Sequence, residues 1–573
     1  MRRLIHRWLS RAIVFVGFLA SGSLLQAQTP LVERLSPDTV FCVAWRGTAS
    51  FSGAEQKNHV LQLLQDPAFA PAWLSLAAAF QQRNQKAEGP AGALGFADIT
   101  SLLENPLVLG VSAVPNGAGS PGPNGQPSRF GFFIVYDATG KAGLIDKWKL
   151  SAQSGNKAHS QATTYDFGGT SVEIRADGAR ATYSAQTAHY FVASDQKQIV
   201  EGLITRFRSA DVNPGSLGHL APFRDLQKFV GSDVALEWYA RIPDPGQWSI
   251  PPSGGKSAVQ FAKTIHLEKI HAVGGGVSFA AEAMHIRGAV LGDTSPGGVF
   301  DLAGPSTATF QTTAVVNGSS TFSMSHFNLA ALYTLAHGAI VGTLSSQQMA
   351  NVSAVEAVGQ SYLGMPIGDA LGLMSGEIAS FSTYSDDGSA QRVFAATIRQ
   401  PEAVLRILRA VAGSMIVAED SSGTATFLDI AYPYKDPKTG TQRRKFYYLA
   451  VTPQMLVGAP RKAMLRETIQ RLGTHADMSP PAGLLASPDF SRMRSLLPEK
   501  LSGLSGSDLT QIPWDKLVSQ LEDQIAQGTK QKNGQQLPDL SWLKPDTISR
   551  HLHIALSGWW KDSGGVYFDS YLQ

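Results

Sequence analysis

The sequence predicts an α+β protein made of two tandem homologous domains, each a mostly antiparallel sheet with helices packed on one face. Similar segments recur in the same order about 265 residues apart. Hairpin-like strands of alternating polarity are interleaved with helices rather than joined by regular β-α-β crossovers. In addition, 56 glycines and 31 prolines among 573 residues favour turns and strands over long helices.

The repeat is clearest in two pairs of segments. The stretch from Tyr190 to Ile199 is similar to that from Met455 to Met464. Likewise, Ala221-Pro222-Phe223 is similar to Ser487-Pro488-Asp489-Phe490. Because chance similarity rarely keeps its order over a whole chain, the pattern indicates an internal duplication. We therefore expect domains at residues 28–295 and 312–573, joined by a linker at 296–311.

In the first copy, apolar and alternating runs predict strands, and helical spacing after capping residues predicts helices. Asp177-Gly178 is a strong hairpin signal, and Ser194 is a typical N-cap residue. The expected strands are 39–45, 107–114, 130–136, 171–175, 181–192, 234–241, 270–279 and 283–291, and the expected helices are 55–65, 72–82, 142–149 and 195–207.

The second copy repeats this list with small changes of spacing. Its expected strands are 320–327, 392–399, 426–434, 445–452, 551–559 and 565–571, and its expected helices are 401–410 and 460–472.

The N-terminus carries an export signal. Four arginines (Arg2, Arg3, Arg7 and Arg11) precede an apolar stretch at 12–25, and Ala27 provides a small residue for cleavage. The stretch is shorter than the roughly 20 apolar residues of a spanning helix. We therefore expect a signal peptide from Met1 to about Ala27 and a periplasmic or secreted protein with no stable membrane span after cleavage. The alternative is an uncleaved N-terminal anchor.

Charge and cysteine content narrow the function classes. The net charge is +3, and no run of Lys or Arg gathers a phosphate-binding surface, so nucleic acid is excluded as a partner. The single cysteine, Cys42, lies in an apolar strand and cannot form an intrachain disulfide. We expect Cys42 to be a small buried side chain.

The chain resembles a family of exported bacterial proteins of unknown function, in which a signal peptide precedes a Leu-Pro-x-Asp-Thr-like opening and repeated α+β units. The residues that carry the resemblance are Leu35, Pro37, Asp38 and Thr39, followed by Ala193-Ser194-Asp195 and Ala221-Pro222-Phe223. The resemblance spans most of the first copy. The resemblance implies export and an α+β fold. It implies no activity, because the function of the family is unknown.

Three features are candidates for a site or an interaction surface. His551 and His553 are two apart on an expected strand, so both would project from one face, as metal ligands in β proteins do, although no third ligand is nearby. Trp559 and Trp560 are adjacent on the same strand and must face opposite sides, so one of them covers a surface or an interface. The loop from Pro115 to Ser128, with Pro115, Pro121 and Pro123, is a further candidate interaction segment.

No catalytic motif is present. The sequence has neither a Gly-x-Ser-x-Gly elbow nor a His-Glu-x-x-His helix, and we expect no cofactor. These observations favour a non-enzymatic binding or assembly protein of the cell envelope, with an envelope protein or a glycan as partner. The alternative is a hydrolase of an envelope polymer with its site in the cleft between the repeats. The ligand and the oligomeric state stay open.

Overall fold

The computed structural model describes residues 30–70, 73, 95–114, 130–153, 162–177, 180–208, 214–242, 261–342, 344–374, 376–384, 390–435, 440–473, 482–519 and 544–573. The expected signal peptide and the loop with Pro115, Pro121 and Pro123 lie outside the described residues.

Ten strands form between Thr39 and Gly292, and helices connect several of them. The strands are β1 (Thr39–Trp45), β2 (Leu107–Ala113), β3 (Phe130–Asp137), β4 (Ala162–Phe167), β5 (Thr170–Asp177), β6 (Arg180–Gln186), β7 (Tyr190–Ser194), β8 (Leu236–Arg241), β9 (Ile270–Phe279) and β10 (Met284–Gly292). The helices include α2 (His59–Gln65), α4 (Phe96–Leu102), α5 (Ala142–Gln153), α6 (Lys197–Arg208) and α7 (Ala221–Val230).

Ten more strands follow. They are β11 (Thr321–Phe327), β12 (Gly376–Tyr384), β13 (Ala390–Thr397), β14 (Ile416–Ser422), β15 (Ala425–Lys435), β16 (Gln442–Val451), β17 (Met455–Ala459), β18 (Gly503–Asp508), β19 (Ile554–Asp562) and β20 (Gly565–Leu572). The helices include α9 (Thr313–Val316), α10 (Leu329–Val341), α11 (Ser346–Leu363), α12 (Ile367–Gly372), α13 (Pro401–Ala412), α14 (Lys462–Gly473), α15 (Pro488–Arg494) and α17 (Pro545–His551).

All twenty strands belong to one antiparallel sheet. From its outer edge inward, the first ten strands are ordered β4, β5, β6, β7, β3, β2, β1, β8, β9, β10. From the opposite edge inward, the other ten are ordered β14, β15, β16, β17, β13, β12, β11, β18, β19, β20. The two sets meet where β10 pairs with β20. Counted inward from the outer edge, the two halves therefore have the same strand order: β14 takes the place of β4, β15 that of β5, and so on to β20, which takes the place of β10.

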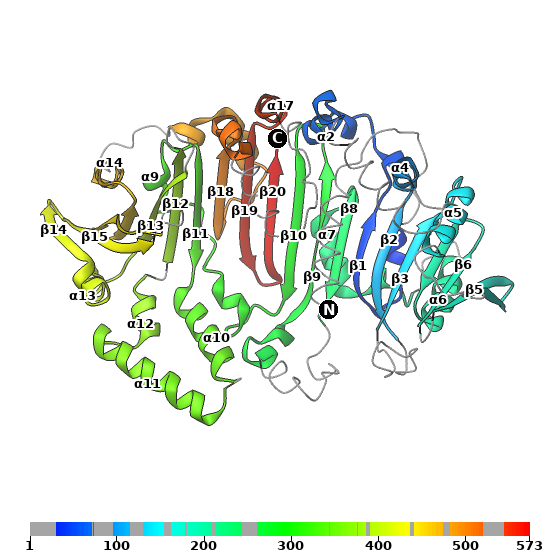
Figure 1. Ribbon diagram of the computed structural model, residues 1–573, viewed down its shortest axis with the longest axis horizontal. Coiled ribbons are helices and arrows are strands. Elements are labelled where there is room, and N and C mark those ends of the chain that lie inside the picture. The colour runs from blue at the N-terminus through cyan, green and yellow to red at the C-terminus, as the bar shows by residue number, and fades with distance from the viewer. Residues whose placement is uncertain are drawn as a thin grey trace.

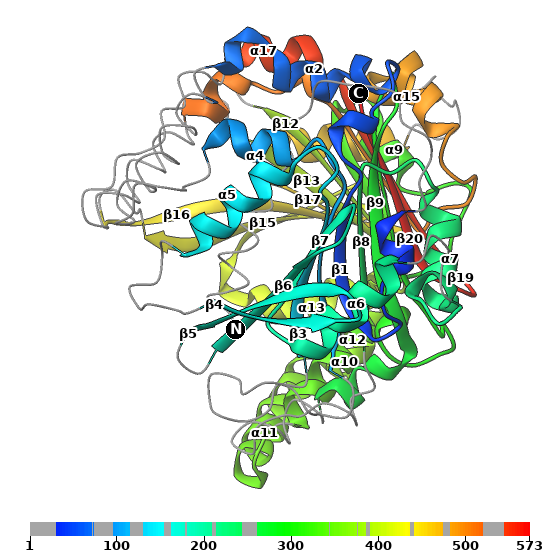
Figure 2. The same cartoon turned by 90° about the vertical axis from the view of Figure 1, so that its right-hand side faces the viewer.

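The sheet is curved, so it has a convex and a concave face. Figure 1 looks onto the concave face, and Figure 2 shows both ends of the sheet curving to one side of the central strands. On the convex face α6 and α7 cover the first ten strands, and α14 and α15 cover the second ten. On the concave face α5 and α13 pack near the two ends. No described helix lies over the middle of that face (Figure 1).

The burial of alternate residues follows from this arrangement. Side chains on the convex side of the strands form the two main cores; Phe133 and Val135 face α6, and Phe322 and Met324 face α15. Most of their immediate neighbours on the concave side are more exposed, whereas Tyr136, next to Val135, is buried beneath α5. Because successive side chains of a strand point to opposite faces, the concave side chains are positioned by the cores behind them.

The helices α10, α11 and α12 connect β11 to β12 and project from one margin of the sheet in both views (Figures 1 and 2). Tyr333 and His337 on α10 both contact the same carboxylate oxygen of Glu356 on α11, at 2.5 and 2.8 Å. This shared contact ties α11 to α10. None of the described helices is both long and apolar enough to cross a membrane.

The predicted α+β class is confirmed, and two details of it are wrong. The two halves share one continuous sheet, because β10 and β20 pair along their full lengths, instead of forming two separate sheets. Helices also cover parts of both faces and not one, since α5 and α13 pack on the face opposite α6 and α14.

Candidate functional site

The concave face carries a row of serines that runs across five neighbouring strands. The row contains one serine from each of β12, β11, β18, β19 and β20, and each is directly opposite the next: Ser380, Ser323, Ser505, Ser557 and Ser570. Directly paired residues share a face of the sheet, so the five hydroxyls line one side. The hydroxyls of Ser570 and Ser557 are hydrogen-bonded at 2.6 Å, and Ser323 is exposed.

A second row lies on the same face of the sheet, two residues along β18, β19 and β20 from the serines, and it pairs aromatic side chains with glycines on neighbouring strands. Trp559 lies opposite Gly503, Phe568 opposite Gly288, and Trp238 opposite Gly275. In each pair the ring fills the space where a glycine Cβ would sit. Such aromatic–glycine pairs shield the glycine backbone and hold the ring flat against the sheet.

A hollow of about 500 Å³ lies at one end of the serine row. Its lining includes Phe394 and Arg392 of β13 and Tyr447 and Lys445 of β16. Phe394 is directly opposite Ser380, so the hollow and the serine row share the concave face. The rings of Phe394 and Tyr447 stack with centroids 6.3 Å apart and an interplanar angle of 14°. The ring of Phe394 also covers Gly458, which fixes its position.

The hollow is positively charged over an aromatic floor. Arg392 and Lys445 are both exposed, and none of the described residues that line the hollow is acidic. Burial, with a smaller contribution from Tyr432, raises the pKa of Tyr447 to about 12, so the phenol stays protonated at neutral pH. This combination places two cationic side chains beside two aromatic rings in one hollow.

A smaller hollow of about 220 Å³ lies on the convex side, where the two halves meet. His285 of β10 and Tyr571 of β20 line it, and their rings stack 4.2 Å apart. His285 also contacts the buried carboxylate of Asp569, to which the Tyr571 hydroxyl donates at 3.4 Å. Arg287 lies 3.7 Å from the same carboxylate. These groups neutralise a buried acid at the β10–β20 seam.

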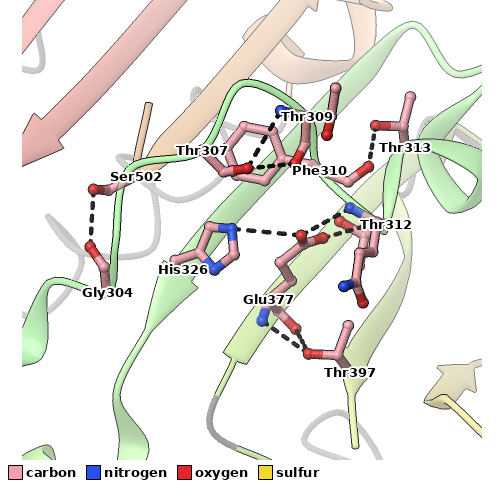
Figure 3. Close-up of polar contacts among 11 residues, drawn as sticks. Gly304, Thr307, Thr309, Phe310, Thr312, Thr313, His326, Glu377, Thr397 and Ser502 are labelled. Atoms are coloured by element: carbon pink, nitrogen blue, oxygen red, sulfur yellow. Dashed lines mark hydrogen bonds and ion pairs between the residues drawn. The ribbon is translucent and has the colours of Figure 1, made fainter. Parts of the chain in front are cut away.

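The chain between the halves is fixed by a second buried acid, Glu377 of β12 (Figure 3). Its carboxylate accepts hydrogen bonds from the backbone N–H groups of Gln311 and Thr312, both at 2.8 Å. Nε2 of His326 is 3.4 Å from the same carboxylate, and the backbone N–H of Glu377 donates to Thr397 at 2.9 Å. Burial lowers the pKa of His326. The cluster therefore holds the end of the expected linker against the sheet.

The adjacent tryptophans face opposite sides, as predicted. Trp560 packs beneath Phe229 of α7 on the convex side, at 5.7 Å between ring centroids, and it stacks on Tyr567. Trp559 lies on the concave side over Gly503. Both tryptophans are partly exposed, and Trp559 is the member of the pair on the concave face.

The strand expected to hold His551 and His553 begins later than predicted. His551 ends α17, and His553 precedes β19, so the pair does not alternate along a strand. His551 instead contacts Asp66 at 3.0 Å, and His553 contacts the carbonyl oxygen of Arg550 at 3.2 Å. Among the described residues no cluster of three or more His, Cys, Asp or Glu side chains could hold a metal ion. Cys42 is buried, as expected, and burial raises the pKa of its thiol.

Sequence reasoning missed the serine row and the charged hollow. A signal for the row was present as Ser-x-Ser spacing at Ser323, Ser380 and Ser505, each followed two residues later by another serine. This spacing puts both serines of a pair on one strand face. The register that aligns the strands could not be read from the sequence.

Comparisons with known proteins place this α+β chain in no family. No family model matches it, and no curated protein matches it. Among solved structures, one described as "Structure of crystal form I of TP0453" has a TM-score of 0.22 and 7% sequence identity, and the alignment covers 48% of this chain and 82% of that one. A similarity this low supports no conclusion about fold or function.

Proposed function

We propose that this chain is an exported, non-enzymatic binding protein of the bacterial cell envelope, built from two homologous halves, and that the concave face of its sheet binds the ligand. The N-terminal sequence supports export to the periplasm or beyond. The identical strand order of the two halves supports a duplication with units at 28–295 and 312–573. The ligand-binding role is supported chiefly by the hollow of about 500 Å³ at the end of the serine row.

The concave face suits binding because its chemistry is mixed and its backbone is fixed. Aromatic rings supply contact area at little conformational cost, and hydroxyls supply hydrogen bonds. The cores on the convex side hold the strands that present these groups. A rigid, preformed surface loses little entropy when a ligand binds.

A photo-crosslinking amino acid placed at single positions of the full-length protein in its native envelope tests this assignment. Phe568, on the concave face, is 39% exposed, whereas Val355, on the projecting helix α11, is 71% exposed. We expect a reproducible adduct with one envelope component from position 568 and none from position 355. Adducts from position 355 alone would overturn the assignment to the concave face.

A second candidate function is hydrolysis of an envelope polymer at the seam between the halves. The contact between His285 and the buried Asp569 beside the hollow of about 220 Å³ is the observation that favours it. A His–Asp pair of this kind is able to act as a general base. If the seam is catalytic, His285→Asn abolishes polymer turnover; if turnover is absent from the unmodified protein or survives the substitution, this candidate is excluded.

A further inference from the structure

We infer that the hollow between β13 and β16 binds an acidic sugar residue of a glycan chain, and that the chain continues along the serine row toward β20. This inference rests on the proposed function, because it names the ligand class of the same concave face.

The first step of the argument is the charge of the hollow. Arg392 and Lys445 line it from two strands, and neither forms an ion pair within the described part of the chain. On the neighbouring α13, by contrast, Arg409 is neutralised by Glu419 at 2.5 Å. Two cations that have no acidic partner among the described residues and line one hollow attract a carboxylate or a sulfate, and they disfavour a cationic ligand.

The second step is the aromatic floor beneath these cations. Phe394 and Tyr447 are partly buried and nearly parallel, so they offer ring faces that do not need to be rearranged on binding. The C–H face of a pyranose packs on an aromatic ring, while its hydroxyls and carboxylate point outward. The hollow therefore matches a sugar ring that bears an acid.

The third step is the direction in which the site continues. From Phe394 the next side chain across the sheet is Ser380, and four more serines follow in register up to Ser570. Neighbouring strands are ~4.8 Å apart, so the five hydroxyls span roughly 19 Å. Regularly spaced hydroxyls can hydrogen-bond to successive sugar residues of an extended chain. The acyl chains of a lipid would instead require a continuous apolar lining beyond the cations.

Binding is tested on the full-length mature protein by calorimetry with a galacturonic acid octamer, its fully methyl-esterified form and phosphatidylglycerol vesicles. We expect the acid octamer to bind at least tenfold more tightly than the ester, with an affinity that falls as salt concentration rises. The double substitution Arg392→Gln/Lys445→Gln should weaken binding of the acid octamer at least tenfold.

Arg444→Gln is the matched control, because Arg444 is the immediate neighbour of Lys445 on β16 and faces the other side of the sheet. It should change affinity less than twofold. The double substitution Ser323→Val/Ser505→Val should weaken the octamer and leave the dimer of the same sugar unaffected. Far-ultraviolet circular dichroism and thermal unfolding show whether each variant remains folded.

Equal affinity for acid and ester, or equal losses from Arg444→Gln and the hollow variant, would overturn the inference. Vesicle binding that depends on Arg392 and Lys445 but not on the serines would replace the glycan with an anionic lipid. If the octamer fails to bind while position 568 still forms its adduct in the envelope, the inferred ligand class is wrong. The assignment of ligand binding to the concave face is then retained.

Discussion

Phe568 lies directly opposite Gly288 across the β10–β20 pair, and its ring occupies the space in which a Cβ of residue 288 would sit. This pair is at the point where the two ten-strand halves join, so the junction depends on a residue without a side chain. Gly275, opposite Trp238, repeats the arrangement within the first half.

The first prediction concerns this junction. Gly288→Val should lower the free energy of unfolding by about 1–3 kcal/mol, because the new side chain overpacks the site of the Phe568 ring. Adding Phe568→Ala should restore part of the loss, and urea denaturation of both single variants and the double variant measures the coupling. Strictly additive losses would show that the ring and the glycine do not interact.

The sequence predicts most strands whose apolar alternation is strong, and it fails where the local signal is weak. The segment 181–192 was expected as one strand, but it divides into β6 and β7 at a turn where Thr187 and Tyr190 exchange hydrogen bonds without a glycine or proline. The strand β14 was missed because six of its seven side chains are exposed and its sequence, Ile-Val-Ala-Glu-Asp-Ser-Ser, has no apolar alternation.

The candidate site was harder to predict because it is built from long-range register. Ser380 and Ser570 lie in one row only because β12, β11, β18, β19 and β20 align in sequence-distant pairs. Strand geometry predicts that Trp559 and Trp560 face opposite sides, but only the structure shows that Trp559 is the one on the concave face. Lys445 ends the basic run Arg443-Arg444-Lys445 and precedes three aromatic residues, but only the long-range pairing through β17 brings Arg392 of β13 close to it.

The second prediction concerns the buried acid of the seam. Asp569→Ala should lower the free energy of unfolding by about 2–4 kcal/mol, since it leaves the largely buried His285 without its acidic partner and removes one of the partners of the partly exposed Arg287. Asp225→Ala is the control, because Asp225 forms an exposed pair with Lys228 and should cost less than about 1 kcal/mol. Equal effects in chemical denaturation would mean that the seam is not stabilised by this acid.

The third prediction concerns the chain segment between the halves. Glu377→Ala should lower the free energy of unfolding by about 2–4 kcal/mol, because the backbone N–H groups of Gln311 and Thr312 lose their acceptor. Hydrogen exchange should become faster at residues 311 and 312 and stay unchanged at the β10–β20 pair. Glu467→Ala, on the exposed side of α14, serves as the control. Unchanged exchange at residues 311 and 312 would contradict the assigned role of Glu377.

The fourth prediction is a pH dependence of stability that originates at Glu237. This residue is 5% exposed beneath α7 and hydrogen-bonded to Gln227, and burial, with a smaller effect from Glu33, raises its pKa from 4.5 to about 8. Between these values the folded state holds a proton that the unfolded state has released, so stability falls as the pH rises. Below pH 4.5 both states are protonated, and the contribution is constant.

Glu237→Gln removes this titration and retains an amide that can bond to Gln227. We expect the melting temperature of the unmodified protein to decline relative to that of the variant between about pH 4.5 and 8. Scanning calorimetry at matched ionic strength measures the difference at each pH. Parallel curves across this range would show that Glu237 has the same proton affinity in the folded and unfolded chain, and that the carboxylate is solvated within the native core.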